Sequence, residues 1–140
     1  GYDHVIDYNS TDFEAAVMRL TDGQGVDVAY DSVGNDTMAR TITSTKRHGT
    51  IIAFGQSSGP YVDFKITDLA KGSYYLSRPT LFHFAADRVW LETASAKLFE
   101  AVSDGTVTVS INQRFPLEDV AKAHEALTGR STTGCTILKP

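Results

Sequence analysis

Several features that would define a function are absent from this sequence. Its single cysteine, Cys135, cannot form an internal disulfide, and no group of Cys and His residues has the spacing of a zinc site. The formal net charge of -4 argues against binding to a nucleic-acid backbone, which requires a basic surface. No apolar stretch approaches the ~20 residues that a membrane-spanning helix needs. We therefore expect no metal, no nucleic-acid partner and no membrane association, and a reducing, cytoplasmic setting.

The composition is that of a globular domain with a hydrophobic core. Of the 140 residues, 41% are hydrophobic and 21% are charged. Short apolar runs alternate with amphipathic stretches along the whole chain. The runs that predict strands lie at 4–8, 26–34, 49–54, 73–80, 106–117 and 135–140. The stretches that predict helices or helical turns lie at 9–23, 36–45, 66–70, 88–105 and 117–127.

Local signals predict where three of these helices begin, end or face the core. Thr11 and Glu14 have the spacing of a capping box at the start of the first helix. Asp87 is the predicted N-cap of the longest helix, and Gly105 its left-handed stop. In the second helix, Met38 and Ile42 are predicted to face inward.

Strands that alternate with helices of this length predict crossover connections and a mostly parallel, doubly wound α/β sheet. The apolar run in GTIIAFGQSSG, residues 49–59, predicts a strand covered on both faces. The glycine-rich segment after it lies where open α/β sheets bind their ligands. A doubly wound nucleotide-binding sheet begins with a strand that runs into G-x-G-x-x-G, and that motif is absent. Either the fold is a different one, or its first strands are missing.

Five short segments carry a more specific signal. They are YDSVG at 30–34, GTIIAFGQSSGP at 49–60, YLSRPTLF at 75–82, INQRFPLEDVAKAHEAL at 111–127 and RSTTGCTILKP at 130–140. In this order and spacing, they resemble the carboxyl-terminal part of the NADPH-dependent quinone oxidoreductases. That family is the zinc-free, zeta-crystallin-like branch of the medium-chain dehydrogenase/reductase superfamily.

The resemblance implies that the chain is a carboxyl-terminal fragment with an incomplete, Rossmann-like parallel sheet. Residues 4–8 would be the third strand of the family's sheet, and the next three predicted strands would be the fourth, fifth and sixth. Because the two strands that should separate residues 4–8 from the fourth strand are absent, we expect this segment to pair with another strand edge, such as one of a second molecule, or to pack loosely. Residues 1–104 would be a partial dinucleotide-binding domain that lacks the first two strands and the glycine-rich loop. Residues 105–140 would be the carboxyl-terminal part of the catalytic domain.

The resemblance also implies which residues line an NADPH site. Ser32, Val33 and Gly34 follow the fourth strand, on the side of the sheet where the cofactor crosses. The family segment that touches the nicotinamide ribose and carboxamide is matched by Phe54, Gly55, Gln56 and Ser57. The other matched positions are Tyr8, near the 2′-phosphate, and Ser77, Arg78, Pro79 and Arg130, along the cofactor pocket. Ordinary turns at strand ends would also explain the glycines, and a surface tyrosine would explain Tyr8 equally well.

No catalytic residue is identified from the sequence. The four histidines share no spacing that suggests a metal site or a catalytic triad; they are His4, His48, His83 and His124. Asp31 is interpreted as a hydrogen-bonded carboxylate at a strand end, and Cys135 as a small buried thiol in the closing strand.

The resemblance implies hydride transfer from NADPH to a quinone or another conjugated carbonyl by the full-length protein. The 140-residue chain alone is expected to be inactive and to bind NADPH weakly. Two alternatives stay open: an alkenal or enoyl reductase of the same superfamily, and a non-catalytic interaction or structural module. A homodimer is expected through residues 73–77, because the predicted outer strand has no Lys, Glu or Pro to discourage pairing.

Overall fold

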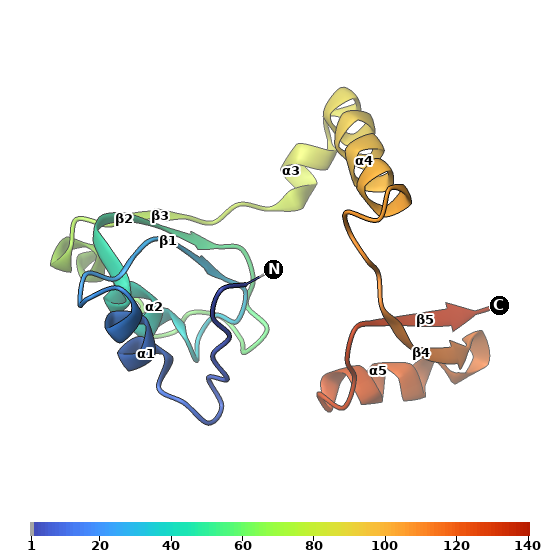
Figure 1. Ribbon diagram of the computed structural model, residues 1–140, viewed down its shortest axis with the longest axis horizontal. Helices are drawn as coiled ribbons and strands as arrows, with labels where there is room; N and C mark the ends of the chain where they lie inside the picture. The colour runs from blue at the N-terminus through green and yellow to red at the C-terminus, as the bar shows by residue number, and fades with distance from the viewer. Residues whose placement is uncertain (1) are drawn as a thin grey trace. The chain divides into compact units, whose positions relative to one another are not determined.

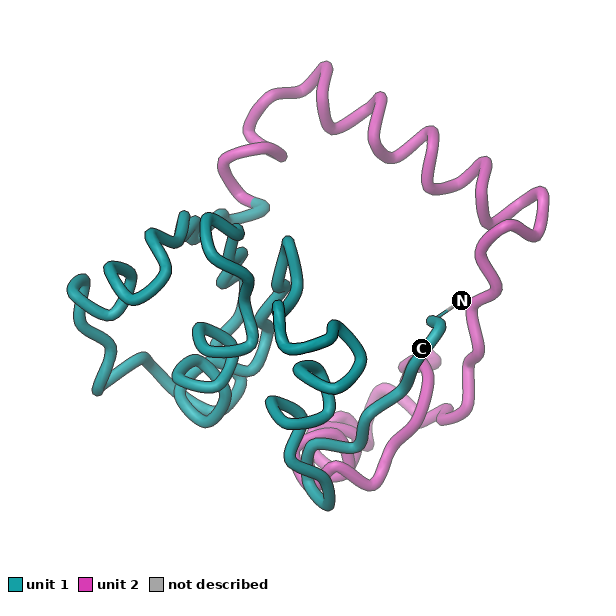
Figure 2. The backbone as a smooth tube through the Cα atoms, turned by 60° about the vertical axis from the view of Figure 1, so that its left-hand side comes forward, with its two compact units in different colours: residues 1–81 teal, residues 82–140 magenta. Residues whose placement is uncertain are grey.

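The structure is a computed structural model that describes residues 2–140, which form two compact units divided after residue 81 (Figure 2). The first unit holds a three-stranded sheet and the second a two-stranded sheet. Among the described residues, no helix has both the length and the apolar character needed to cross a membrane. The domain boundary that the resemblance implies, after residue 104, remains a prediction.

The first unit is built around a parallel sheet with the strand order β1-β2-β3. Its strands are β1 (Val26–Asp31), β2 (Thr45–Ala53) and β3 (Tyr75–Ser77), and Figure 1 shows them side by side. The helix α2 (Met38–Thr43) connects β1 to β2, and the 3₁₀ helix η1 (Ile66–Lys71) precedes β3. The predicted α/β class with parallel crossovers is therefore confirmed.

The helix α1 (Phe13–Leu20) begins one residue later than its predicted capping box. Its N-cap is Asp12, not Thr11, and the Asp12 carboxylate accepts a hydrogen bond of 3.3 Å from the Ala15 amide. A negatively charged carboxylate at this position is also stabilised by the positive end of the helix dipole. α1 packs on α2, where the Arg40 guanidinium lies 4.6 Å from the centre of the Phe13 ring.

The core lies between α2 and one face of the sheet. Met38 and Ile42 face inward as predicted and pack with Ile51 and Ala53 of β2. Ile51 has no exposed surface. The core is completed by partly buried side chains from the segment after β2 and from β3: Tyr61, Phe64, Tyr74 and Leu76.

The prediction that the β2 strand is covered on both sides holds only in part, since Thr50 and Ile52, on the face opposite the core, are half-buried. Side chains alternate between faces along a strand, so the residues paired in register at Val28, Thr50 and Tyr75 share the second face. Val28 is 47% exposed and Tyr75 65% exposed, and Tyr30, two residues after Val28, is 74% exposed. Within the described residues, the second face of the sheet is thus half-covered at β2 and open at β1 and β3.

Residues 4–8 form no strand, which corrects their interpretation as one and agrees with the expectation that the segment packs loosely. A strand needs a neighbour to exchange backbone hydrogen bonds with, and the described strands all pair elsewhere. The segment is instead followed by a turn in which the Asp7 carbonyl accepts from the Ser10 and Thr11 amides. Ile6 is half-buried, whereas Val5 is 86% exposed.

The strand β2 begins at Thr45, four residues before the predicted apolar run. His48 adopts a positive φ of 63°, and the pairing with β1 is irregular between Val26 and Val28. A β-bulge of this kind allows the strand to continue through polar residues that by composition alone suggest a turn.

The second unit contains a parallel pair of strands joined through a helix (Figure 1). The strands β4 (Ile111–Pro116) and β5 (Cys135–Lys139) are connected by η2 (Leu117–Asp119) and α5 (Val120–Thr128). Both strands and α5 were predicted. Cys135 is exposed, which corrects its interpretation as a buried thiol.

Two helices precede this pair of strands: α3 (Leu81–Ala85), which the sequence did not predict, and α4 (Arg88–Ser103), which it did. The Asp87 carboxylate accepts from the Val89 and Trp90 amides at 2.9 and 3.1 Å, and Gly105 has a positive φ of 80°. Both predicted ends of α4 are therefore confirmed.

Candidate functional site

Two turns meet at the carboxyl ends of β1 and β2, and hydrogen bonds join them into one surface. The first turn is Ser32–Gly34 and the second is Phe54–Gly59. The Ser57 amide donates to the Ser32 carbonyl at 3.3 Å, and the Ser58 amide donates to the Val33 carbonyl at 2.8 Å. The Ser58 hydroxyl also donates to Val33, at 2.8 Å. The two turns therefore hold each other in place.

Glycine is required where the two turns touch. A Cβ atom at Gly55 would lie 2.4 Å from the Ser32 carbonyl oxygen, and one at Gly34 would lie 2.9 Å from the Gln56 Cα. Gly34 also has a φ of 100°, which glycine adopts without strain. The absence of a side chain at Gly55 is thus required by the contact with Ser32 alone, before any cofactor is considered.

Asp31, the last residue of β1, lies beneath the first turn and is only 3% exposed. Its carboxylate accepts hydrogen bonds of 2.9 Å from both the Val33 and the Gly34 amides. It also accepts bonds of 2.8 Å from the hydroxyls of Thr37 and Thr41. The interpretation of Asp31 as a hydrogen-bonded carboxylate at a strand end is confirmed.

Tyr61 supports the second turn from the core side. Its hydroxyl donates a hydrogen bond of 2.7 Å to the Gly55 carbonyl. Burial raises the pKa of the phenol above its ordinary value, and the charge of Asp31 adds to this, while Arg78 opposes it. The phenol therefore stays protonated and remains a hydrogen-bond donor at neutral pH.

A cavity of about 270 Å³ opens beside the first turn. It brings together three of the predicted cofactor-binding residues, Tyr8, Ser32 and Val33. The remaining lining residues are Ile6, Phe13, Tyr30, Asp31, Thr37 and Thr41. Tyr8 reaches this cavity although its segment is not a strand.

The predicted residues of the second turn present polar and aromatic groups beside this cavity. Phe54 is 50% exposed, and its ring lies 6.5 Å from the ring of Tyr30, which lines the cavity, in an edge-to-face arrangement. Gln56 and Ser57 are exposed. The turn therefore offers a flat ring, an amide and a hydroxyl to a ligand.

The other predicted residues lie further along the chain. Ser77 ends β3, so it lies at the same carboxyl edge of the sheet as Asp31 and Ala53. Arg78 is exposed, and its guanidinium donates to the Pro79 carbonyl at 3.0 Å. Arg130 belongs to the second unit, where it is exposed with a φ of 53°.

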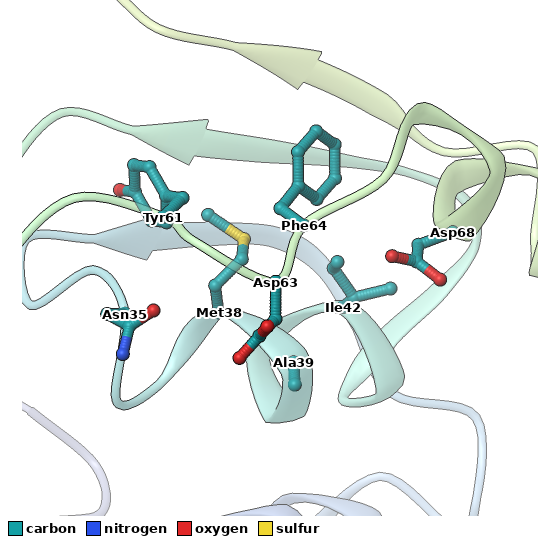
Figure 3. A pocket seen from close by; sticks show the side chains of 8 residues that line it. All are labelled: Asn35, Met38, Ala39, Ile42, Tyr61, Asp63, Phe64 and Asp68. Atoms are coloured by element: carbon teal, nitrogen blue, oxygen red, sulfur yellow. The ribbon is translucent and has the colours of Figure 1, made fainter.

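A second, smaller cavity of about 120 Å³ lies between α2 and the segment that follows the second turn (Figure 3). Figure 3 shows Met38, Ala39, Ile42 and Phe64 as its apolar lining, with the carboxylates of Asp63 and Asp68 near by. Asn35 and Tyr61 complete the lining. In the described part of the chain, no group of three or more His, Cys, Asp or Glu residues is arranged to hold a metal ion.

The sequence did not single out Thr37, Thr41, Ser58 and Tyr61, which stabilise the two turns. A usable signal exists for the first pair: two threonines four residues apart share one face of a helix. That face lies next to the predicted inward face, at Met38 and Ile42. Ser58 and Tyr61 carry no comparable pattern.

The profile of the family described as zinc-binding dehydrogenase matches residues 1–138. The chain is 37% identical over 142 residues to the 2-haloacrylate reductase of a Burkholderia species. It is 39% identical over 136 residues to the quinone oxidoreductase of Pseudomonas aeruginosa. These alignments cover 100% and 96% of the chain. The chain spans 43% and 42% of the length of these two relatives.

The structural similarity is closer than the sequence identity suggests. The crystal structure of Escherichia coli quinone oxidoreductase complexed with NADPH superposes with a TM-score of 0.95 at 36% identity. The alignment covers 100% of this chain and 44% of that one. The resemblance drawn from five short segments, and the Rossmann-like fold it implies, are confirmed. The chain belongs to the zinc-binding dehydrogenase family, and its relatives there include quinone oxidoreductases.

Proposed function

We propose that the protein containing this chain is an NADPH-dependent reductase that transfers hydride to a quinone. The observation that carries the proposal is the hydrogen-bonded pair of turns at the carboxyl ends of β1 and β2. Open α/β sheets bind ligands at this edge. A quinone oxidoreductase with the same fold and 36% identity was crystallised with NADPH.

The residues present fit such a cofactor. The pair of turns offers the Phe54 ring beside the Gln56 amide and the Ser57 hydroxyl, which suit a flat ring that carries a carboxamide. The cavity beside the first turn presents the hydroxyls of Tyr8 and Ser32. The other residues assigned to the cofactor are Val33, Gly34, Gly55, Ser77, Arg78, Pro79 and Arg130.

In this mechanism the chain's residues orient the reactants and exclude water. When bound, NADPH supplies the hydride, and a proton from solvent completes the conversion of a quinone to a hydroquinone. The turns are fixed by hydrogen bonds before any ligand binds, so little ordering free energy is lost on binding. Phe54, half exposed at the edge of the sheet, keeps water from one side of a bound ring.

A second candidate is reduction of a carbon–carbon double bond conjugated to a carbonyl, as in an alkenal or enoyl reductase. It is favoured by the 2-haloacrylate reductase, which is as similar to this chain as the quinone oxidoreductases. Both reactions use the same hydride donor. They differ in the substrate that accepts the hydride, and therefore in the pocket that binds it.

We also propose that the protein is a cytoplasmic homodimer. β3 is the outermost strand of its sheet, and Tyr75 on it is 65% exposed. An unpaired strand edge is a template for another strand, and pairing about a twofold axis satisfies its amides and carbonyls.

The test measures NADPH oxidation by the complete protein in two separate assays. One assay uses a benzoquinone as the hydride acceptor, and the other uses 2-chloroacrylate. We expect turnover with the quinone. Turnover with 2-chloroacrylate alone would favour the second candidate, and turnover with neither would favour a non-catalytic module.

The 140-residue chain on its own serves as the control. It is expected to show no turnover and weak NADPH binding, because it lacks a glycine-rich loop to bind the pyrophosphate. A submicromolar dissociation constant for this chain would contradict the assignment of the cofactor site.

A further inference from the structure

The carboxylate of Asp31 is a buried charge without a matching cation. None of the ion pairs formed by the described residues includes it. Its negative charge is instead stabilised by four hydrogen-bond donors: two backbone amides and two threonine hydroxyls. A buried charge persists only when such donors satisfy it.

These four donors come from two different parts of the chain. The Val33 and Gly34 amides belong to the first turn, whereas Thr37 and Thr41 belong to the segment that begins α2 and to α2 itself. Thr37 is 6% exposed and Thr41 is 7% exposed, so water does not compete for the carboxylate. The carboxylate therefore connects the conformation of the turn to the position of the helix.

The backbone of Asp31 connects the same carboxylate to the second turn. Its carbonyl accepts from the Phe54 amide at 2.9 Å and from the Gly55 amide at 3.3 Å. A shift of Asp31 would therefore move both turns of the candidate site. Asp31, Thr37 and Thr41 also line the cavity of about 270 Å³, together with Ser32 and Val33.

We propose that Asp31, Thr37 and Thr41 form a positioning cluster that sets the geometry of the turn against which the nicotinamide half of NADPH binds. This inference rests on the proposed function. The three residues act through the amides of Val33 and Gly34 and do not themselves contact the cofactor. Their hydroxyls and carboxylate keep the Ser32–Gly34 turn in one conformation before the ligand arrives.

Removal of a hydroxyl from this cluster should weaken the binding of one half of NADPH and not of the other. Loss of one hydroxyl leaves a buried carboxylate oxygen underpaired, so the Asp31 carboxylate is expected to shift toward other donors and to move the turn whose amides bind it. The nicotinamide half of NADPH then loses its contacts with this turn, whereas the 2′-phosphate, which is assigned to Tyr8, does not depend on the hydrogen bonds that hold the turn. The probe for the adenosine half is 2′,5′-ADP, which has the 2′-phosphate but no nicotinamide.

The experiment compares Thr37→Val and Thr41→Val with a matched control, Thr45→Val, in the complete protein. Thr45 is 3% exposed, and its hydroxyl donates to the Thr41 carbonyl at 2.7 Å, away from the carboxylate. All three changes remove one buried hydroxyl and keep the side chain's shape. Asp31→Asn is a further variant, and Thr37→Ser is the conservative rescue because it restores the hydroxyl.

The dissociation constants for NADPH and for 2′,5′-ADP are measured for each folded variant. We expect Thr37→Val and Thr41→Val to raise the constant for NADPH about tenfold above that of Thr45→Val. The constant for 2′,5′-ADP should stay near the wild-type value, and Thr37→Ser should bind NADPH like the wild type.

Two results would overturn the inference. One is an equal effect of the three valine variants on NADPH binding. The other is a parallel loss of affinity for both ligands, which indicates general loosening of the domain. A wild-type protein that binds no NADPH would instead refute the proposed function, and the inference with it.

Discussion

The hydroxyl of Tyr61 donates a 2.7 Å hydrogen bond to the carbonyl of Gly55, across the base of the second turn. The bond joins the half-buried side chain of a core residue to a backbone group at the candidate site. Changes at Tyr61 should therefore affect the conformation of the turn without altering any group that faces a ligand.

Replacement of Tyr61 by Phe removes this hydrogen bond and keeps the ring. We expect the free energy of unfolding to fall by about 1 kcal/mol, because the Gly55 carbonyl loses its partner in a partly buried position. Urea denaturation of both proteins at neutral pH measures the difference. A variant as stable as the wild type would show that water replaces the phenol at no cost.

The same variant should also change how the free energy of unfolding depends on pH. Burial, and then the charge of Asp31, raise the pKa of Tyr61 above the ordinary 10.0, so the folded protein holds the proton more tightly than the unfolded chain. The stability contributed by the protonated phenol is fully present below about pH 10 and is lost as the pH rises through the higher, folded-state pKa. Denaturation across this alkaline range should show a steeper loss of stability for the wild type than for Tyr61→Phe.

Replacement of Gly55 by Ala should disrupt the contact between the two turns. The added Cβ would lie 2.4 Å from the Ser32 carbonyl oxygen, and a backbone atom has no rotamer by which to move away. We expect a loss of about 2 kcal/mol or more, in the range of overpacked sites.

Gly23→Ala is the matched comparison for this change. Gly23 has a φ of 77° but no atom within 4 Å of the added Cβ, so only backbone strain of about 1 kcal/mol is expected. Thermal denaturation of both variants measures the contrast. An equal loss at the two positions would mean that the turns separate easily.

The adjacent serines Ser57 and Ser58 should have separable roles. Ser58→Ala removes a hydroxyl that donates to the Val33 carbonyl at 2.8 Å and accepts from the Asp36 amide at 3.0 Å. We expect it to lower the free energy of unfolding by about 1 to 2 kcal/mol. Ser57→Ala changes an exposed side chain and should weaken NADPH binding with little effect on stability. Thermal denaturation and NADPH titration of both variants test this; the opposite pattern would exchange the assignments.

The proposed dimer predicts an effect of proline in β3. Tyr75→Pro removes a backbone amide and should convert the dimer to a monomer if that amide points to the free edge. If it points to β2, Leu76→Pro is the informative change. Tyr75→Phe keeps the amide and the ring and should stay dimeric. Sedimentation gives the oligomeric state, and circular dichroism confirms folding; a wild type that is monomeric at tens of micromolar would end the proposal.

The sequence predicted correctly those features that depend on a few adjacent residues. The α4 ends at Asp87 and Gly105 were predicted because capping depends on a few adjacent residues. Residues 4–8 were wrongly predicted as a strand, since apolar composition does not show whether a pairing partner exists. The start of β2 was missed because the bulge near His48 depends on the pairing with β1.

The cofactor contacts of the candidate site stay a prediction, but its two turns are present in the structure. The resemblance identified both turns, because glycine and serine positions are visible in a short segment. The hydrogen bonds that hold the turns depend on contacts between distant residues, such as Ser58 with Val33 and Tyr61 with Gly55. Such contacts leave no pattern in one sequence, so Ser58 and Tyr61 emerged only from the structure.

The sheet of the first unit has a consequence for how the domain tolerates sequence change. Its buried side chains come from one layer, centred on Met38, Ile42, Ile51 and Ala53, and in the described residues the other face is at most half-buried. Because so few side chains supply the apolar burial, each provides a large fraction of the total. Truncation of Ile51 to Ala, which costs ~2 to 5 kcal/mol in a well-packed core, is comparable to the whole stability of a small domain. Val28 and Tyr75, on the other face of the sheet, lie outside this buried layer.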